Sequence, residues 1–408
     1  MSRRLPRRAL SLCVLLAAVA GPPLRATSVA HAHADPGRPH AERTAAGLVQ
    51  ESATARLRTD GSLSDVVGLS TTDIWAVGQQ DVWEAWQNRS VLTHWDGAAW
   101  TEAGIRNDPS GAGHLRSVAA VSPRDIWAVG DGHDGLPYVV RGDGSVFDRV
   151  SVPQFGTGDW LGGVAAVPGR VVAVGARGRE PLIATAGAKG WSIAKIKGKG
   201  KGTLYGVAVT EKGDGWAVGD DESGPLIMRA TGGTWKHVAA PEVEGGYLRD
   251  VYLDGPRKAV AVGGVYHGEG DISPLVLEWN GKRWSRAAVP GGRAELYGVT
   301  GDGKGHFWIS GFDPAHPGAA YLLRGDGRKW KVVRGEASPR PRTVRLQAVT
   351  HVGDLTLAVG HVVDERDRYT DVVERFQPGA TPSGDAAGAG SVGGPDATGS
   401  RGRAPAEK

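Results

Sequence analysis

The sequence predicts an all-β fold: a seven-bladed β-propeller of four-stranded blades, closed by an N-terminal strand that completes the last blade. Three observations predict this fold. A segment of the form Ile-Trp-Ala-Val-Gly recurs at intervals close to the length of one propeller blade. Glycine accounts for 63 of 408 residues, about twice its usual share. Tryptophan (14 residues) outnumbers tyrosine (8) and phenylalanine (5), as expected when one aromatic residue packs every repeat.

The repeat is clearest between Ile74–Gly78 and Ile126–Gly130, which are identical. Weaker copies end at Gly175, Gly219, Gly263, Gly311 and Gly360. The spacings between the seven final glycines lie between 44 and 52 residues. Seven units of this length predict seven blades.

Each unit opens with the pattern Leu-x-small-Val, which we assign to the innermost strand. The leucines are Leu63, Leu115, Leu161, Leu204, Leu248, Leu296 and Leu346. The third position is Asp65, Ser117, Gly163, Gly206, Asp250, Gly298 or Ala348. Small residues are expected where seven strands converge on one axis.

The other strands of a unit follow in order. The Ile-Trp-Ala-Val-Gly segment is apolar at successive positions, as expected of a second strand covered on both faces. The third strand begins near a proline, at Pro137, Pro181, Pro225 or Pro274. A tight turn such as Asp96-Gly97 or Asn280-Gly281 then leads to the fourth strand. The fourth strand starts with an aromatic residue: Trp100, Phe147, Trp191, Trp235, Trp284 or Trp330.

The seventh unit ends near Phe376 without a fourth strand. We expect the segment Ser52–Arg58 to supply it, because joining the two ends of the chain protects the edges of an open array. The propeller should therefore span residues 52–378, after a linker at 35–51. Residues 379–408 are rich in Gly, Ala, Ser and Pro and are expected to be disordered.

Residues 1–34 have the features of a signal peptide. Basic residues Arg3–Arg8 precede the apolar run Ala9–Ala20, and small residues favour cleavage near Ala34. We therefore expect a secreted, extracellular protein. The run is too short to span a membrane, and no later segment is long and apolar enough to do so.

Charge and cysteine content exclude several classes of function. The formal charge is +4, but residues 1–34 hold five arginines and no acid, so the remainder carries −1. This argues against binding to nucleic acid. The one cysteine, Cys13, lies in the signal peptide, so the secreted part has neither a disulfide nor a reactive thiolate.

The blade from Gly215-Trp216-Ala217-Val218-Gly219 to Trp235 resembles one repeat of the bacterial-neuraminidase-repeat-like propellers, which include the photosystem II assembly-factor propellers. The resemblance covers about Leu63 to Phe376 and is limited to the pattern within a blade. It implies a propeller and often a scaffold or assembly role. The Ser-x-Asp-x-Gly-x-x-Trp boxes of sialidases are absent from the sequence, so no catalytic residue is carried over.

Candidate binding residues lie where the loops before the first strand and after the second strand share one face, the top. Trp83 and Trp86 occupy the longest loop after a second strand. The residues at the entry of innermost strands are able to grip a ligand by stacking and bidentate hydrogen bonds. They are Arg116, Trp160, Tyr205, Tyr247, Arg249, Tyr297 and Gln347.

These observations favour a secreted, non-catalytic binding or scaffold module, monomeric, whose partner is a glycan, a cell-wall polymer or a secreted protein. A carbohydrate-binding lectin is the first alternative, with the tryptophans and tyrosines as stacking platforms. A glycoside hydrolase or lyase is the second, and requires paired carboxylates across the channel. The sequence predicts no catalytic residue, no metal site and no cofactor.

Overall fold

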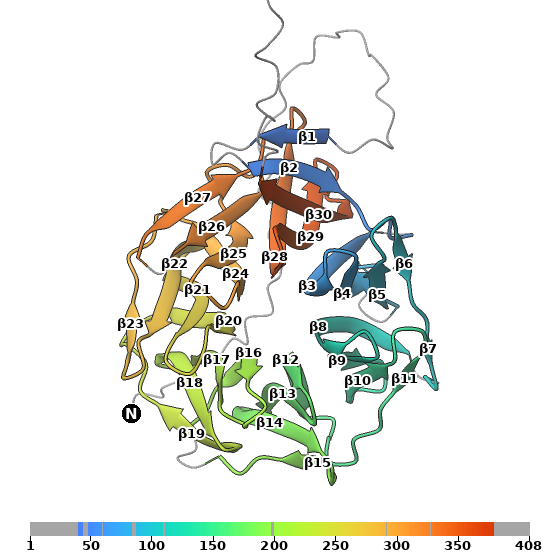
Figure 1. Cartoon of the computed structure of the whole chain (residues 1–408), viewed down its shortest axis with the longest axis vertical. Coiled ribbons are helices and arrows are strands. Elements are labelled where there is room, and N and C mark those ends of the chain that lie inside the picture. The colour runs from blue at the N-terminus through green and yellow to red at the C-terminus, as the bar shows by residue number, and fades with distance from the viewer. Residues whose placement is uncertain are drawn as a thin grey trace, which may run out of the picture. The chain divides into compact units, whose positions relative to one another are not determined.

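The computed structural model describes residues 40–43, 48–58, 60–83, 87–108, 111–196, 200–290, 292–326 and 328–378. The predicted signal peptide and C-terminal tail lie outside these ranges, as does Trp86. Within them the chain forms seven antiparallel blades arranged in a ring around a central opening (Figure 1). The prediction of a seven-bladed propeller is therefore confirmed. No helix in these ranges is long and apolar enough to cross a membrane.

The first four blades run in chain order from the inside of the ring to the outside. Blade 1 is β3 (Gly61–Ser70), β4 (Asp73–Gln80), β5 (Arg89–Trp95) and β6 (Trp100–Glu102). Blade 2 is β8 (Ala112–Ser122), β9 (Asp125–Gly132), β10 (Pro137–Gly142) and β11 (Phe147–Arg149), with β7 (Ile105–Arg106) added in parallel at its edge. Blade 3 is β12 (Asp159–Val167), β13 (Arg170–Arg177), β14 (Glu180–Gly187) and β15 (Gly190–Ile193). Blade 4 is β16 (Thr203–Val209), β17 (Gly215–Asp221), β18 (Gly224–Thr231) and β19 (Thr234–Val238).

The last three blades complete the ring. Blade 5 is β20 (Gly246–Leu253), β21 (Ala259–Gly268), β22 (Asp271–Trp279) and β23 (Trp284–Arg286). Blade 6 is β24 (Glu295–Gly301), β25 (Phe307–Phe312), β26 (Tyr321–Gly325) and β27 (Trp330–Arg334). Blade 7 is β28 (Arg342–Val352), β29 (Leu355–Asp364) and β30 (Tyr369–Pro378), with β2 (Leu48–Ala53) and then β1 (His40–Arg43) at its outer edge.

The N-terminal strand closes the ring as predicted, but at a different position. β2 pairs with β30 over Leu48–Ala53, so the boundary between a linker at 35–51 and a strand at 52–58 is wrong. The residues after β2 are held instead by one side chain, because the carboxylate of Asp371 accepts hydrogen bonds from the backbone N–H groups of Ala55 and Leu57. β2 itself is fixed by the buried Glu374, which accepts hydrogen bonds from Gln50 Nε2 (2.8 Å) and Ser52 Oγ (2.9 Å).

The core consists of apolar clusters, each of which lies between two neighbouring blades. The second strand of a blade contributes to two clusters at once. In β4, Ile74 and Ala76 pack toward blade 7, whereas Trp75 and Val77 pack toward blade 2. This explains why the second strands are apolar at successive positions.

A tryptophan in the second strand pairs with a cationic or imidazole side chain directly opposite it in the third strand. Trp75 stacks on His94 with ring centroids 4.2 Å apart, and the guanidinium of Arg141 lies 5.0 Å from the Trp127 ring. Arg229 covers Trp216 in the same way, at 5.3 Å. Arg324 lies over Trp308 in the same arrangement. These stacking or cation–π pairs hold the buried indoles in four of the blades.

A β-bulge occurs at the same place in the innermost strand of every blade, directly after the repeated leucine. Each leucine is fully buried and lies opposite the glycine that ends the Ile-Trp-Ala-Val-Gly segment. A Cβ atom at Gly219 would lie 1.8 Å from the backbone oxygen of Thr203, and the other six glycines are equally crowded. The repeated glycine is therefore required by the close approach of the bulged strand.

Candidate site at the channel mouth

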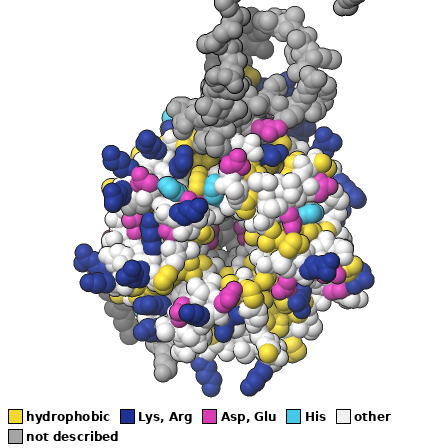
Figure 2. Space-filling view, in the orientation of Figure 1, with side chains coloured by type: hydrophobic (Ala, Val, Ile, Leu, Met, Phe, Trp, Pro, Cys, Tyr) yellow, Lys and Arg dark blue, Asp and Glu magenta, His cyan; other side chains and the backbone are white. Residues whose placement is uncertain are grey.

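The innermost strands enclose a central channel with a cavity volume of about 420 Å³. Figure 2 shows the hollow at the centre of the ring. The bulge inserts one extra residue per blade between the leucine and the small residue, and all seven extra residues line the channel. They are Ser64, Arg116, Gly162, Tyr205, Arg249, Tyr297 and Gln347. Five of these were predicted as binding residues from the sequence.

Ring contacts link the side chains of blades 2 to 5 into a continuous arc. The guanidinium of Arg116 lies 5.2 Å from the Trp160 ring, and Trp160 meets Tyr205 edge-on with centroids 5.7 Å apart. The Arg249 guanidinium then lies between two tyrosines, 5.0 Å from the ring of Tyr205 and 5.1 Å from that of Tyr247. Trp160 and Tyr247 belong to this arc although they are not among the residues that line the channel.

Hydrogen bonds continue the arc through blades 6 and 7. Glu295 accepts a hydrogen bond from Tyr247 Oη on one carboxylate oxygen (3.1 Å) and from Tyr297 Oη on the other (2.6 Å). The guanidinium of Arg345 donates to Tyr297 Oη (2.7 Å) and lies 3.6 Å from Glu295. We call the connected set Arg116, Trp160, Tyr205, Arg249, Tyr247, Glu295, Tyr297 and Arg345 the rim arc.

The tyrosines of the rim arc remain protonated at physiological pH. Burial raises the pKa of Tyr205 to about 12, with the nearby Asp220 carboxylate as the next cause. Burial and the charge of Glu295 also raise the pKa values of Tyr247 and Tyr297 above the usual 10. These phenols are therefore hydrogen-bond donors rather than nucleophiles.

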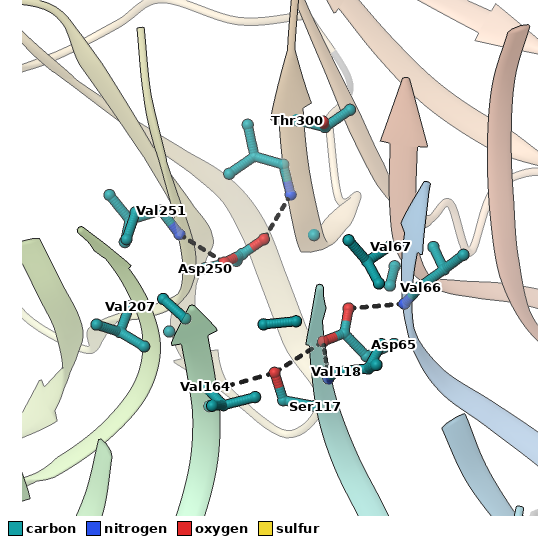
Figure 3. A pocket seen from close by; sticks show the side chains of 18 of the residues that line it. Asp65, Val66, Val67, Ser117, Val118, Val164, Val207, Asp250, Val251 and Thr300 are labelled. Carbon is teal, nitrogen blue, oxygen red and sulfur yellow. Dashed lines mark hydrogen bonds between the residues drawn. The ribbon is translucent and has the colours of Figure 1, made fainter. Parts of the chain in front are cut away.

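Two carboxyl groups lie one residue further along the innermost strands, at the positions that the sequence pattern reserves for small residues (Figure 3). Asp65 accepts hydrogen bonds from the backbone N–H of Val66 (2.8 Å), from Ser117 Oγ (2.8 Å) and from the backbone N–H of Val118 in blade 2 (2.9 Å). This side chain thus joins the innermost strands of blades 1 and 2. We call the level of the channel that holds Asp65 and Asp250 the waist.

Asp250 joins blades 5 and 6 in the same manner. Its carboxylate accepts hydrogen bonds from the backbone N–H groups of Val251 (2.8 Å) and Val299 (2.9 Å). Burial raises the pKa of Asp65 to about 6 and that of Asp250 to about 7. The charge of Asp65 contributes to the increase at Asp250. Because both carboxyl groups hold backbone N–H groups, they are braces between blades rather than a free acid–base pair.

Trp83, the remaining predicted residue that the structure describes, is not among the residues that line the channel. Trp83 is 56% exposed and meets the ring of Tyr369 edge-on, with centroids 5.3 Å apart. Tyr369 in turn packs on the imidazole of His361, whose Nδ1 lies 2.9 Å from Ser62 Oγ. Trp83 therefore forms a separate aromatic platform over blades 7 and 1.

Sequence reasoning missed the acidic members of the site. Glu295 bridges two tyrosines, Asp131 binds the Arg116 guanidinium at 2.5 Å, and Asp220 lies beside Tyr205. A signal was present for part of the arrangement, because the position between the leucine and the small residue holds five different residue types in the seven repeats, whereas the leucine itself never changes. In the part of the chain that the structure describes, no group of three or more His, Cys, Asp or Glu side chains is placed to hold a metal ion.

No family model matches the chain, and no curated protein matches it significantly. Several solved structures have a similar fold. The structure of YCF48 bound to D1 peptide is similar, with a TM-score of 0.53 and 16% identity, and the match covers 83% of this chain and 97% of that one. The WD40 β-propeller domain of Doa1 is similar with a TM-score of 0.54 and 11% identity, covering 81% and 98%. The resemblance to photosystem II assembly-factor propellers is thus confirmed at the level of the fold.

Proposed function

We propose that this chain is a secreted, non-catalytic scaffold that binds a protein partner at the mouth of its channel. The rim arc is the observation that carries the proposal. It connects six consecutive blades through aromatic rings, arginines and one bridging carboxylate. Arginine, tyrosine and tryptophan are the residues that contribute most to protein interfaces.

The asymmetry of the rim arc supports a protein partner. The seven bulge positions hold five different residue types, so the mouth presents one composite surface rather than seven equivalent pockets. A lectin that repeats its site is expected to place similar aromatics in several blades. YCF48 has been solved with a bound D1 peptide, and an extended peptide is the kind of ligand that we propose here.

The state of the polar groups supports a non-catalytic role. The Tyr297 hydroxyl donates to Glu295 and accepts from Arg345, and its pKa is raised, so it is poorly suited to act as a nucleophile. The two carboxyl groups of the waist are engaged by backbone N–H groups of neighbouring blades. A glycosidase needs one such pair free to reach a glycosidic bond from both sides.

The test is selection of peptides from a random display library on the purified chain. We expect enriched peptides whose binding is weakened at least tenfold by Tyr297→Ala, because this residue joins the rim arc to the channel. The matched control is Tyr266→Ala, which removes a tyrosine that is 45% exposed and does not line the channel. Equal loss in both variants, or no enrichment on a folded chain, would argue against the proposal.

A lectin remains the second candidate function because of the aromatic platform at Trp83. An exposed indole supported by a tyrosine edge is suited to stacking on a sugar ring. Binding to a glycan array that disappears in Trp83→Ala but persists in Tyr297→Ala would favour this candidate over a protein partner.

A further inference from the structure

Arg249 has an environment that differs from that of the other arginines in the rim arc. It is the extra residue of the bulge in β20 and lines the channel. Its guanidinium lies between the rings of Tyr205 and Tyr247, at 5.0 and 5.1 Å from their centroids. The two rings hold the side chain in one position and reduce the conformational entropy that it would lose on binding.

The guanidinium of Arg249 has unused hydrogen-bond donors, whereas the other two arginines of the rim arc have acceptors. Arg116 donates to Asp131, and Arg345 donates to Tyr297 beside Glu295. Among the described residues, Arg249 makes no hydrogen bond or ion pair comparable to those of Arg116 and Arg345. Its Nε is buried without a partner. A buried charged donor without an acceptor is costly, which points to a ligand group that completes it.

The surroundings of Arg249 determine which shape of ligand group can bind there. Because tyrosine rings lie over the guanidinium, a ligand reaches Arg249 along the planar edge that carries its N–H groups. Parallel N–H donors at such an edge match the two oxygens of a carboxylate.

The charges along the channel fix the depth at which an anion stops. Arg116 and Arg249 lie among the bulge residues, and the next residue in the strand brings the waist with Asp65 and Asp250 (Figure 3). An anion is attracted by the arginines at the level of the bulge residues and repelled by the aspartates of the waist. A single acidic group at a chain end or on a side chain fits this arrangement, since only its tip has to enter.

We propose that the channel mouth binds one carboxylate group of a protein partner, from a chain end or an acidic side chain, on the edge of Arg249. This inference rests on the proposed function and names the chemistry that it requires. Asp220 interacts electrostatically with Arg249 and competes with the incoming carboxylate. Its removal should therefore strengthen binding.

The experiment uses the full chain labelled with ¹⁵N-arginine and follows the Arg249 Nε–Hε signal, which is identified by its absence in Arg249→Lys. The probes are N-acetylglycine for a chain end, N-acetylglutamic acid α-amide for a side chain, and N-acetylglycinamide as the neutral control. We expect both acids to shift the signal and to bind at least tenfold more tightly than the neutral amide.

Three variants separate a specific site from a general charge effect. Arg249→Lys keeps the charge but loses the planar edge, so the preference for acids should fall to less than threefold. Asp220→Asn should strengthen binding of the acids several-fold. Arg286→Lys, at an exposed position on the outer strand β23, should change nothing.

The result that overturns the inference is an Arg249 signal that does not respond to the acids, or that responds equally to the neutral amide. A stronger response to inorganic phosphate, or a response to glucuronic acid alone, would also overturn it, because the ligand would then be a phosphate or an acidic glycan. The proposed function fails separately, through absence of selected peptides, while the Arg249 site still binds the small acids.

Discussion

The two carboxyl groups of the waist make the stability of the fold depend on pH in a direction that can be worked out. Burial, with the charge of Asp65 as a smaller cause, raises the pKa of Asp250 from 3.8 to about 7 in the folded chain. The folded state therefore binds this proton more tightly than the unfolded state does. The stabilisation that comes from this proton on Asp250 is complete below about pH 4 and is lost as the pH rises through 7.

The magnitude follows from the difference in pKa. One pKa unit corresponds to about 1.4 kcal/mol, so Asp250 alone should lower the free energy of unfolding by up to about 3 kcal/mol between about pH 5 and pH 8. Because the side chain of Asp250 is only partly buried, the effect is weakened, and we expect about 1.5 to 3 kcal/mol. His361 acts in the opposite direction, because burial lowers its pKa to about 4 and it must be protonated on unfolding in acid.

The assay therefore compares the chain with Asp250→Asn, in which every other group is unchanged. Urea unfolding is followed by tryptophan fluorescence at about pH 5, 6, 7 and 8. The native chain should lose stability relative to the variant as the pH rises from about 5, and the difference should level off above about pH 7. In Asp65→Asn the same loss should level off earlier, above about pH 6. A difference that is independent of pH, or that favours the native chain at high pH, would refute the reasoning.

Three further predictions concern the framework. Gly219→Ala should cost about 3 kcal/mol or more because its Cβ meets a backbone oxygen at 1.8 Å, whereas Gly104→Ala, with open space around it, should change the urea midpoint little. Glu374→Ala should cost about 2 kcal/mol by leaving Gln50 without its acceptor, and hydrogen exchange should accelerate in β2; protection equal to that of the native chain would contradict this. Arg229→Leu should cost about 1 kcal/mol by removing the cation over two buried indoles, and an unchanged thermal midpoint would show that the contact is not stabilising.

The fold could be predicted from the sequence because the same packing problem is solved seven times. Each repeated leucine is buried beneath a bulge, and each repeated glycine accommodates the bulged strand. Such constraints are local to one blade, so they leave a periodic pattern. The tight turns were predicted for the same reason, since Gly97 and Gly281 adopt the positive φ values of 99° and 92° that Asp-Gly and Asn-Gly pairs permit.

The acidic partners of the site could not be predicted, because they depend on contacts between blades. Glu295 meets a tyrosine from blade 5 that lies 48 positions earlier, and no local pattern marks it as a bridge. The prediction of where the closing strand lies was wrong for a related reason. Ser52–Arg58 is adjacent to the first blade, but the register of β2 is fixed by the distant Glu374, which binds both Gln50 and Ser52.

The bulge separates the residues that maintain the fold from those that determine what it binds. The leucine before the bulge is invariant across the seven blades, and the residue after it stays small or forms a brace, as Asp65 and Asp250 do. The extra residue between them is left out of the strand pairing and lines the channel, so neither the ladder nor the core fixes its identity. Gly162 is the exception, because a Cβ there would meet the Trp160 ring. It is serine, arginine, glycine, tyrosine, arginine, tyrosine and glutamine in successive blades. Substitutions at these positions, together with their partners in the rim arc, are therefore expected to change specificity. The fold should tolerate them far better than it tolerates a change at the flanking leucine.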